Sequence, residues 1–423
     1  MRYRQAEQYF GRIHVIVEGK RYCDQVYMKI INGSVYTPEF RFEKKNIYAG
    51  DGRFLGISDA ADNSAGGIMD IDEETIVDAS GCYVIPGLVD IHFHGCMGAD
   101  FCDASNEAIE TLARYEAAQG VTAICPATLT LPVETLNAVL RCAAEYAGGS
   151  HAPDEADLVG INMEGPFISH VKKGAQNGDY IIPCDSAVCE SFLEASRGLV
   201  KIIGLAPEEN PDFREYISAV KDKVRVSLAH TNADYETAMA AFEAGACHVV
   251  HLYNAMPPLL HRDPGVVGAV RDSDHVMAEL ICDGNHVHPA AVRSAFDMLG
   301  EERIVLISDS LRACGMGDGL MMLGGQEVEV HGTRATLTDS GALAGSVCSL
   351  TRCMQTAVLK MGIPLETAVR CASYNPAYAI GILDEYGSIE EGKHADCVLL
   401  DKKDLSLRAV VKDGVKIKTV KGL

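Results

Sequence analysis

Short apolar runs alternate with amphipathic segments through the middle of the chain, from Val84 to about Met361. The amphipathic segments, such as residues 106–120, 133–149 and 234–246, are rich in Ala, Leu and Glu, and several end at Gly, as helices commonly do. This alternation predicts parallel β-strands that are connected by helices. The eight apolar runs read VIPGLVDIHFH, VTAICPATLT, LVGINMEGPF, VKIIGLAPE, VRVSLAHT, CHVVHLYNAM, MAELICDGNHVH and RIVLISDS. Eight such units are what a closed (β/α)8 barrel of the TIM type requires, so we predict an α/β fold of this kind.

Both ends of the chain show a different pattern, in which short β-branched stretches alternate with turns. Residues 13–86 contain several such stretches, separated by Asn-Gly and Asp-Gly turns, and the same pattern resumes after the barrel region. We therefore predict a small β-sandwich domain that is assembled from residues 1–86 and 387–423. The barrel, residues 87–386, would be inserted between these two parts.

Composition narrows the classes of partner. The chain has 423 residues, and its 59 acidic and 37 basic side chains give a formal charge of −22, which disfavours a nucleic-acid surface of clustered Lys and Arg. No apolar stretch approaches the roughly 18 residues that cross a bilayer, and the first ten residues lack the apolar core of a signal peptide. We expect a cytoplasmic protein with neither a nucleic-acid nor a membrane partner. The 15 Cys are scattered without a Cys-x-x-Cys pair, which indicates reduced thiols.

Side chains that bind metals stand at the ends of five of the predicted strands. In VDIHFHG, residues 89–95, side chains alternate between the two faces of a strand, so His92 and His94 point to the same side. Catalytic groups of such barrels gather at the carboxyl ends of the strands. The strand-end residues of this kind are His92, His94, Glu164, His230, His251 and Asp309.

Together these side chains predict a divalent metal site. Imidazoles and carboxylates are accepted ligands of transition metals and no thiolate is required, so the nearby Cys96 and Cys102 are interpreted as small core thiols. A single strand-end His is more often a hydrogen-bonded packing residue, and a single Asp or Glu is usually a cap or a surface charge. Six ionisable groups at one rim, however, would be costly to bury without a metal ion or ion pairs.

The predicted ligand set indicates a hydrolase. A zinc-like ion lowers the pKa of its bound water from about 15.7 towards 7 and polarises a carbonyl, which suits the hydrolysis of amide-type bonds. A further group must move protons, and a carboxylate beside the attacking water can accept a proton and return it to a leaving amine. Asp309 is the candidate for this role. The alternative is that Asp309 is a plain metal ligand.

Several motifs run in order from about Ile30 to the C-terminus. They are PGLVDIHFHG, NMEGPFIS, AHTNADYETA, HLYNAMPPLLHRDPGVVG, CDGNHVHP, LISDSLRACG, GALAGS and NPAYAIGI. Together they resemble the N-acetylglucosamine-6-phosphate deacetylases of the amidohydrolase superfamily. MEGPF and HLYNAM separate this family from dihydroorotases and ureases, which carry a lysine ligand on the fourth strand. Here Lys201 stands at the start of that strand and not at its carboxyl end.

This resemblance implies a ligand set and a proton carrier. The principal metal would be bound by Glu164, His230 and His251. A second metal, in members that keep both histidines, would be bound by His92 and His94. Asp309 would be the general base and acid. The cofactor is then one or two divalent ions per chain, with zinc as the first choice and iron, manganese or cobalt as alternatives that accept the same ligands.

The resemblance also implies a phosphate pocket and a homodimer. Phosphate contacts would come from Asn254, the backbone of Ala255 and His286. The resemblance implies that Arg262 reaches in from a neighbouring subunit. A guanidinium suits bidentate phosphate contacts; the alternative is a surface ion pair with Asp263 or another carboxylate. Gln176 stands where some relatives carry a His that contacts the acetyl carbonyl or a sugar hydroxyl, and its amide can still donate a hydrogen bond.

The reaction that the resemblance implies is hydrolysis of the acetamide of N-acetyl-D-glucosamine 6-phosphate to D-glucosamine 6-phosphate and acetate. Two alternatives remain open. One is the same chemistry on another amino sugar phosphate, such as N-acetylgalactosamine 6-phosphate, because a sequence does not reveal the orientation of one hydroxyl. The other is a catalytically silent barrel that binds a sugar phosphate. Residues 1–27 extend beyond the resemblance, and no role is predicted for them.

Overall fold

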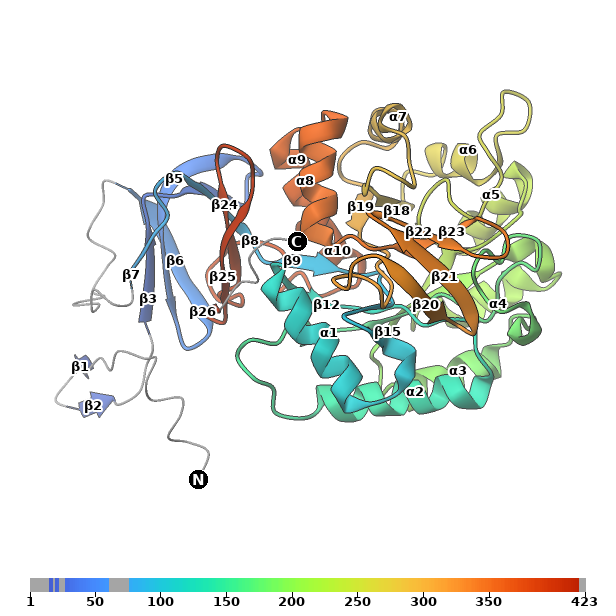
Figure 1. Ribbon diagram of the computed structural model, residues 1–423, viewed down its shortest axis with the longest axis horizontal. Coiled ribbons are helices and arrows are strands. Elements are labelled where there is room, and N and C mark those ends of the chain that lie inside the picture. Colours follow the sequence, from blue (N-terminus) through green and yellow to red (C-terminus); the bar gives the residue numbers. More distant parts are fainter. Residues whose placement is uncertain (1–14, 18–19, 23–26, 61–75, 418–423) are drawn as a thin grey trace.

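The computed structural model describes residues 15–17, 20–22, 27–60 and 76–417. Two bodies lie side by side in Figure 1: a smaller one built of strands from both ends of the chain, and a larger one in which helices surround parallel strands. This arrangement confirms the predicted TIM-like barrel with a small β domain formed from both chain ends.

Eight parallel strands between residues 88 and 307 form the barrel, one in each predicted apolar run. They are β9 (Leu88–Asp90), β12 (Val121–Ile124) with the short β13 (Asp157–Leu158) beside it, β14 (Ile161–Met163), β15 (Val200–Leu205), β16 (Arg225–Leu228), β17 (His248–Val249), β18 (Met277–Ile281) and β19 (Ile304–Ile307). Strands β14 to β19 pair in sequence order, and β12 pairs with β9. A parallel bridge between Ala127 and Asn162 links β12 to β14, and the Asp309 N–H donates to the His92 carbonyl over 2.9 Å, which closes the ring between β19 and β9.

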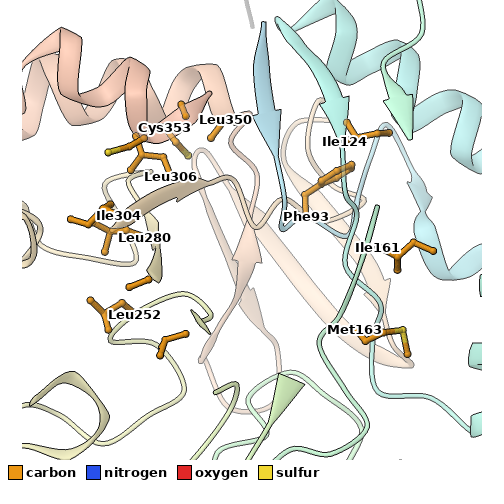
Figure 2. Close-up of a cluster of buried hydrophobic side chains, with 14 of the residues drawn as sticks. Phe93, Ile124, Ile161, Met163, Leu252, Leu280, Ile304, Leu306, Leu350 and Cys353 are labelled. Carbon is orange, nitrogen blue, oxygen red and sulfur yellow. The ribbon is translucent and has the colours of Figure 1, made fainter. Parts of the chain in front are cut away.

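Helices cover the outside of this ring, and their buried side chains pack against the strands to form the barrel core. They are α1 (Asn106–Ala118), α2 (Val133–Ala147), α3 (Ser186–Ala195), α4 (Phe213–Val220), α5 (Tyr235–Ala244), α6 (Gly265–Arg271), α7 (Pro289–Leu299), α8 (Leu350–Met361), α9 (Leu365–Ala372) and α10 (Tyr374–Ala379). The α1 helix begins after Ser105, whose hydroxyl accepts from the Ala108 N–H at 3.1 Å, a typical N-cap. Leu350 and Cys353 of α8 pack beside Leu306 of β19 (Figure 2). Among the described residues, none of the helices has the length and apolarity that a membrane span requires.

The small β domain has nine paired strands. They are β3 (Tyr27–Ile31), β4 (Ser34–Tyr36), β5 (Phe42–Gly50), β6 (Arg53–Asp59), β7 (Ile76–Asp78), β8 (Cys82–Pro86), β24 (Cys397–Asp401), β25 (Leu407–Lys412) and β26 (Val415–Ile417). Strand β24 runs antiparallel to β8, with Leu399 opposite Val84, so the two chain ends share one sheet. The long β5 pairs with β3 and β6 in one half and with β4 in the other, and both halves enclose a core that includes Ile47, Phe54 and Val411.

A four-stranded antiparallel sheet follows β19, and the alternation of strands and helices does not predict it. Its strands are β20 (Gly319–Leu323), β21 (Gln326–His331), β22 (Arg334–Leu337) and β23 (Leu343–Ser346). Val328 and Val330 alternate with exposed residues along β21 and pack with Leu311 in a core of their own. This period-two pattern in QEVEVH was the available sequence signal.

Two short hairpins lie outside these sheets. The strands β10 (Gly95–Cys96) and β11 (Ala99–Asp100) pair just after the first barrel strand. The strands β1 (Val15–Val17) and β2 (Lys20–Tyr22) pair within the N-terminal extension. Most of residues 1–27, for which no role is predicted, lie outside the described residues.

Candidate active site

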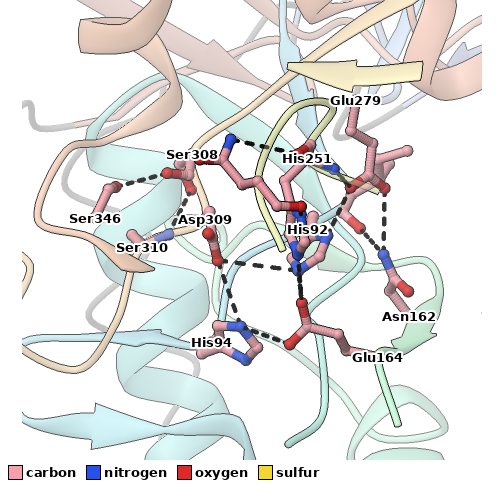
Figure 3. Close-up of polar contacts among 12 residues, drawn as sticks. His92, His94, Asn162, Glu164, His251, Glu279, Ser308, Asp309, Ser310 and Ser346 are labelled. Carbon is pink, nitrogen blue, oxygen red and sulfur yellow. Dashed lines mark hydrogen bonds and ion pairs between the residues drawn. The ribbon is translucent and has the colours of Figure 1, made fainter. Parts of the chain in front are cut away.

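The six side chains predicted at strand ends as metal ligands converge on one point of the barrel rim. Figure 3 labels five of them, and the sixth, His230, contacts Glu164 and His251. His92 and His94 follow β9, Glu164 follows β14, and the remaining three residues follow β16, β17 and β19: they are His230, His251 and Asp309. Because parallel strands of a barrel all end at the same rim, residues far apart in the sequence meet there.

Glu164 lies at the centre of the cluster and is 2% exposed. Its Oε1 is 3.0 Å from Nε2 of both His230 and His251 and 3.2 Å from Nε2 of His92, while its Oε2 is 3.4 Å from Nε2 of His94. Burial opposes ionisation of this carboxyl, but the His230 and His92 imidazoles hold its pKa well below its usual range. The centre therefore holds a buried carboxylate ringed by four imidazoles.

The ring nitrogens that face Glu164 are acceptors when their rings are neutral, which is the form that binds a metal. His230 Nδ1 is 2.9 Å from the carbonyl oxygen of Lys172, and His251 Nδ1 is 3.2 Å from that of Asn254. A carbonyl oxygen can only accept, so each Nδ1 carries a proton and a neutral ring leaves its Nε2 with a bare lone pair.

These lone pairs make the cluster a fitting site for a cation. The Nε2 atoms of His230 and His251 lie 3.2 Å apart, and both contact Glu164 Oε1, so three acceptors crowd together. Two overlapping groups have ligand atoms within 4.8 Å of one another: His92, Glu164 and His251, and His92, His94 and Asp309. Among the described residues, the buried Nε2 of His92 has no hydrogen-bond partner. Imidazole and carboxylate ligands in this number fit one or two divalent transition-metal ions.

Asp309 borders the second group. Its Oδ1 is 3.4 Å from Nε2 of His94 and 3.9 Å from Nε2 of His92. Burial opposes ionisation, but the hydrogen bond from His94 and the imidazole of His92 lower the pKa of Asp309. The side chain is therefore a carboxylate at neutral pH and can accept a proton.

The backbone is strained at three of these positions. His230, His251 and Asp309 have φ values of 42°, 27° and 49°, in the left-handed region that residues other than glycine rarely adopt. Each residue comes shortly after a barrel strand, where this conformation turns the chain across the rim. Such strain costs about 1–3 kcal/mol per residue and is typical of functional sites.

A cavity of about 370 Å³ opens above the cluster. Its wall includes Gln176, Asn254, Ala255 and His286, four of the five residues expected to bind substrate. Arg262, the fifth, does not line the cavity and lies exposed in the loop after β17.

Gln176 and His286 are both held by specific partners. The Gln176 amide nitrogen donates to Glu164, and its oxygen accepts from the Thr130 N–H at 2.6 Å. Nδ1 of His286 is 2.9 Å from Oδ2 of Asp283; burial disfavours the charged ring, but this hydrogen bond raises the pKa of His286.

Three further residues lie near the site: Lys172, which was not predicted from the sequence, and Cys96 and Cys102, which were predicted to be core thiols and not metal ligands. Lys172 lines the cavity, and its Nζ donates to the Met256 carbonyl at 3.3 Å. Cys96 packs in the barrel core, and Cys102 Sγ accepts from the Leu129 N–H at 3.2 Å; neither belongs to a candidate metal group of the described residues.

Two buried residues inside strands, Glu279 on β18 and His248 on β17, contact each other and stand behind the histidine cluster. Their only sequence signal is a polar residue within an apolar run, such as MAELI. Strand-end reasoning passes over them, because neither residue ends its strand.

Comparison with known proteins agrees with this geometry. Residues 83–421 match the family model described as the amidohydrolase family. This chain belongs to the amidohydrolase family. An N-acetylglucosamine-6-phosphate deacetylase of Bacillus subtilis is 38% identical over 319 residues, which cover 75% of this chain and 80% of that protein. The resemblance seen in the sequence motifs is thereby confirmed.

Two further relatives bear on fold and substrate. A solved structure of N-acetyl-D-glucosamine-6-phosphate deacetylase from Mycobacterium smegmatis superposes with a TM-score of 0.84 at 28% identity and covers 92% of this chain and all of its own (100%). An N-acetylgalactosamine-6-phosphate deacetylase of Escherichia coli O157:H7 is 36% identical over 316 residues, which cover 75% of this chain and 83% of that protein. Relatives of this chain are thus named for two epimeric substrates.

Proposed function

We propose that this protein is a metal-dependent deacetylase that hydrolyses N-acetyl-D-glucosamine 6-phosphate to D-glucosamine 6-phosphate and acetate. The observation that carries the proposal is the cluster of buried acceptors around Glu164, with the ionised Asp309 3.4 Å from His94 at its edge. The relatives named for this reaction support the choice of substrate. We further propose that the reaction takes place in the cytoplasm.

The proposed ligands would form two metal positions. Glu164, His230 and His251 would hold the principal ion, and His92 and His94 would hold a second. When bound, such an ion lowers the pKa of a coordinated water towards about 7 and polarises the acetyl carbonyl. Zinc suits these ligands, and iron, manganese and cobalt share the same preference for imidazole and carboxylate.

Asp309 would move the proton. Its carboxylate would accept a proton from the water that attacks the acetyl carbon, and would return this proton to the sugar nitrogen as the carbon–nitrogen bond breaks. The products are then acetate and the protonated amine, which together account for both hydrogens of the added water. The Gln176 amide, held by Glu164 and the Thr130 N–H, would border the acetyl group in the same cavity.

Cationic groups along the cavity would bind the phosphate. Asn254 and the Ala255 backbone line the wall beside His286, whose raised pKa favours the imidazolium form that attracts a phosphate. Lys172 adds an ammonium group to the same wall.

Arg262 would complete the phosphate pocket from the second subunit of a homodimer. In the described part of the chain its guanidinium forms no ion pair, not even with Asp263, and the neighbouring Leu259 and Leu260 are 45% and 51% exposed. An unpaired Arg beside exposed leucines in one loop is the composition of a subunit contact.

Acetate release from N-acetylglucosamine 6-phosphate by purified protein, with elemental analysis of the same sample, tests the proposal. We expect release together with one or two divalent ions per chain. N-acetylgalactosamine 6-phosphate is the second candidate, which the Escherichia coli relative favours, and it is assayed at equal concentration. A higher kcat/KM for N-acetylgalactosamine 6-phosphate would show that this compound, and not the proposed one, is the preferred substrate. Binding of either compound without acetate release would indicate a silent sugar-phosphate-binding barrel.

A further inference from the structure

A buried carboxylate, Glu279, lies directly behind the cluster of proposed ligands (Figure 3). It is 0% exposed and accepts four hydrogen bonds. Its Oε2 is 2.6 Å from His92 Nδ1 and accepts from the His251 N–H at 3.3 Å. Its Oε1 accepts from His248 Nε2 at 3.0 Å and from Asn162 Nδ2 at 3.4 Å. Glu279 therefore links the strand-end segments that carry two of the proposed metal ligands.

The contact with Glu279 determines which nitrogen of His92 is free. A carboxylate accepts, so the His92 Nδ1 must donate, and a neutral ring then directs its Nε2 lone pair at Glu164 and Asp309. The second histidine of the pair differs, because the buried Nδ1 of His94 has no hydrogen-bond partner in the part of the chain that the structure describes. Of the two histidines proposed for the second ion, His92 alone is fixed in tautomer and orientation by a carboxylate.

His248 leaves the charge of Glu279 available to His92. Burial lowers the pKa of His248, so this ring is neutral and donates to Glu279 without cancelling its charge. The other two donors, the Asn162 amide and the His251 backbone, are also neutral. A full negative charge against Nδ1 makes the opposite nitrogen of an imidazole a stronger ligand.

We propose that Glu279 is a positioning residue that makes His92 a preorganised Nε2 ligand and so sets the affinity of the second metal position. The inference rests on the proposed metal-dependent function. It assigns the role to a residue that contacts neither the cavity nor the expected substrate. Carboxylates that orient a ligating histidine in this way commonly change metal affinity by about 10–100-fold when they are replaced.

The test is the substitution Glu279→Gln, with the binding of both ions measured in metal-buffered Zn²⁺ titrations and by elemental analysis after dialysis. A glutamine has one acceptor oxygen, and its amide N–H groups would face the donors of His248 and Asn162, so the four hydrogen bonds cannot all form. We expect the affinity for the second ion to fall about 10–100-fold, while the ion held by Glu164, His230 and His251 stays bound. This readout does not depend on any substrate.

Controls separate positioning from a general loss of structure. Asp283→Asn makes the same chemical change two residues beyond β18 and should leave the binding of both ions unchanged. If Glu279→Gln does not fold, Glu279→Asp takes its place. It keeps the negative charge but moves it away from His92, so it should weaken binding of the second ion by a smaller factor than the roughly 10–100-fold expected for Glu279→Gln. In a His92→Asn background, Glu279→Gln should cause no further loss of the second ion.

Three outcomes overturn the inference: wild-type affinity for both ions in Glu279→Gln and Glu279→Asp, equal weakening of both ions, or a wild-type protein that binds a single ion. Failure of the proposed function is recognisable separately. A wild-type protein that binds two ions but releases no acetate from either amino sugar phosphate would refute the deacetylase and leave the metal-binding comparison readable.

Discussion

At the scale of single residues, hydrogen bonds to both the backbone N–H and the backbone carbonyl of Asp309 hold it in place. Its N–H donates to the His92 carbonyl at 2.9 Å, and its carbonyl accepts from the Ser346 N–H at 2.7 Å. These bonds hold the left-handed backbone that presents the carboxylate to His94. The side chain itself is the one strand-end carboxylate that lies at the edge of the cluster and not at its centre. A group that must both contact a reacting water and release its proton is suited to such a place.

Asp309→Asn is expected to lower kcat about 10²–10⁴-fold, because the amide has the same size and backbone but cannot accept the proton. Metal content should remain that of the wild type, since Glu164, His230 and His251 are untouched. The measurement is acetate release together with elemental analysis. If Asp309 is only a ligand, the variant will instead lose metal, and added Zn²⁺ will restore its turnover.

At the scale of elements, the strand ends account for what the sequence could predict. The eight apolar runs predicted eight parallel strands. Because such strands all end at one rim, the sequence also predicted that Glu164, His230 and Asp309 lie close together, although they are far apart in the chain. Glu279 was beyond this reasoning, because a polar residue inside an apolar run shows its purpose only when its partner, His92, is located in space. The sheet of β20 to β23 was missed because its alternating pattern interrupts an otherwise regular series of strands and helices.

The loop after β17 contains Arg262, the residue proposed to bind the phosphate from the second subunit. Arg262→Ala should raise KM for the sugar phosphate about 10–100-fold with little change in kcat, because a charge-assisted contact worth about 1.5–3 kcal/mol is lost. Steady-state kinetics give both values. Size-exclusion chromatography should still show a dimer, since the exposed Leu259 and Leu260 remain.

Mixed dimers decide which subunit supplies the guanidinium. When Asp309→Asn and Arg262→Ala chains are co-refolded, one site of each mixed dimer has an intact Asp309 and faces an intact Arg262 of the other subunit. At substrate concentrations well below the KM of the Arg262→Ala variant, activity should then rise above that of either variant alone. Activity no higher than the mean of the two parents would show that Arg262 serves its own subunit or none.

At the scale of the whole molecule, one buried lysine joins the β domain to the barrel. Lys412 ends β25 and is 1% exposed. Its Nζ lies 2.7 Å from Oδ2 of Asp157, on the barrel strand β13, and 2.7 Å from Oδ2 of Asp413, with Oδ2 of Asp396 at 3.8 Å. The Tyr386 hydroxyl also donates to Asp157 at 3.0 Å. The C-terminal strand β25 thus supplies the positive charge that balances the carboxylate of Asp157 on the barrel.

The carboxyl group of Asp396 makes this contact dependent on pH. Burial raises the pKa of Asp396 to about 6, although Lys412 opposes the rise. In the unfolded chain the pKa of an Asp is about 3.9, so the folded state binds this proton more tightly. Ionisation of Asp396 therefore costs stability as the pH rises through about 4 to 6, and the cost is fully present above that range. Lys412, whose own pKa is raised by these carboxylates against the effect of burial, offsets the cost at neutral pH.

Lys412→Met should therefore destabilise the protein by about 3–5 kcal/mol at pH 7.5, because it leaves buried carboxylates without a counter-charge. The deficit should shrink at pH 5, where Asp396 takes up a proton and one of the uncompensated charges disappears. Urea unfolding midpoints of wild type and variant at the two pH values measure both effects. Lys416→Met, an exposed change on the neighbouring β26, is the matched control and should shift the midpoint little. A deficit of equal size at pH 5 and pH 7.5 would mean that Lys412 contributes packing and not charge.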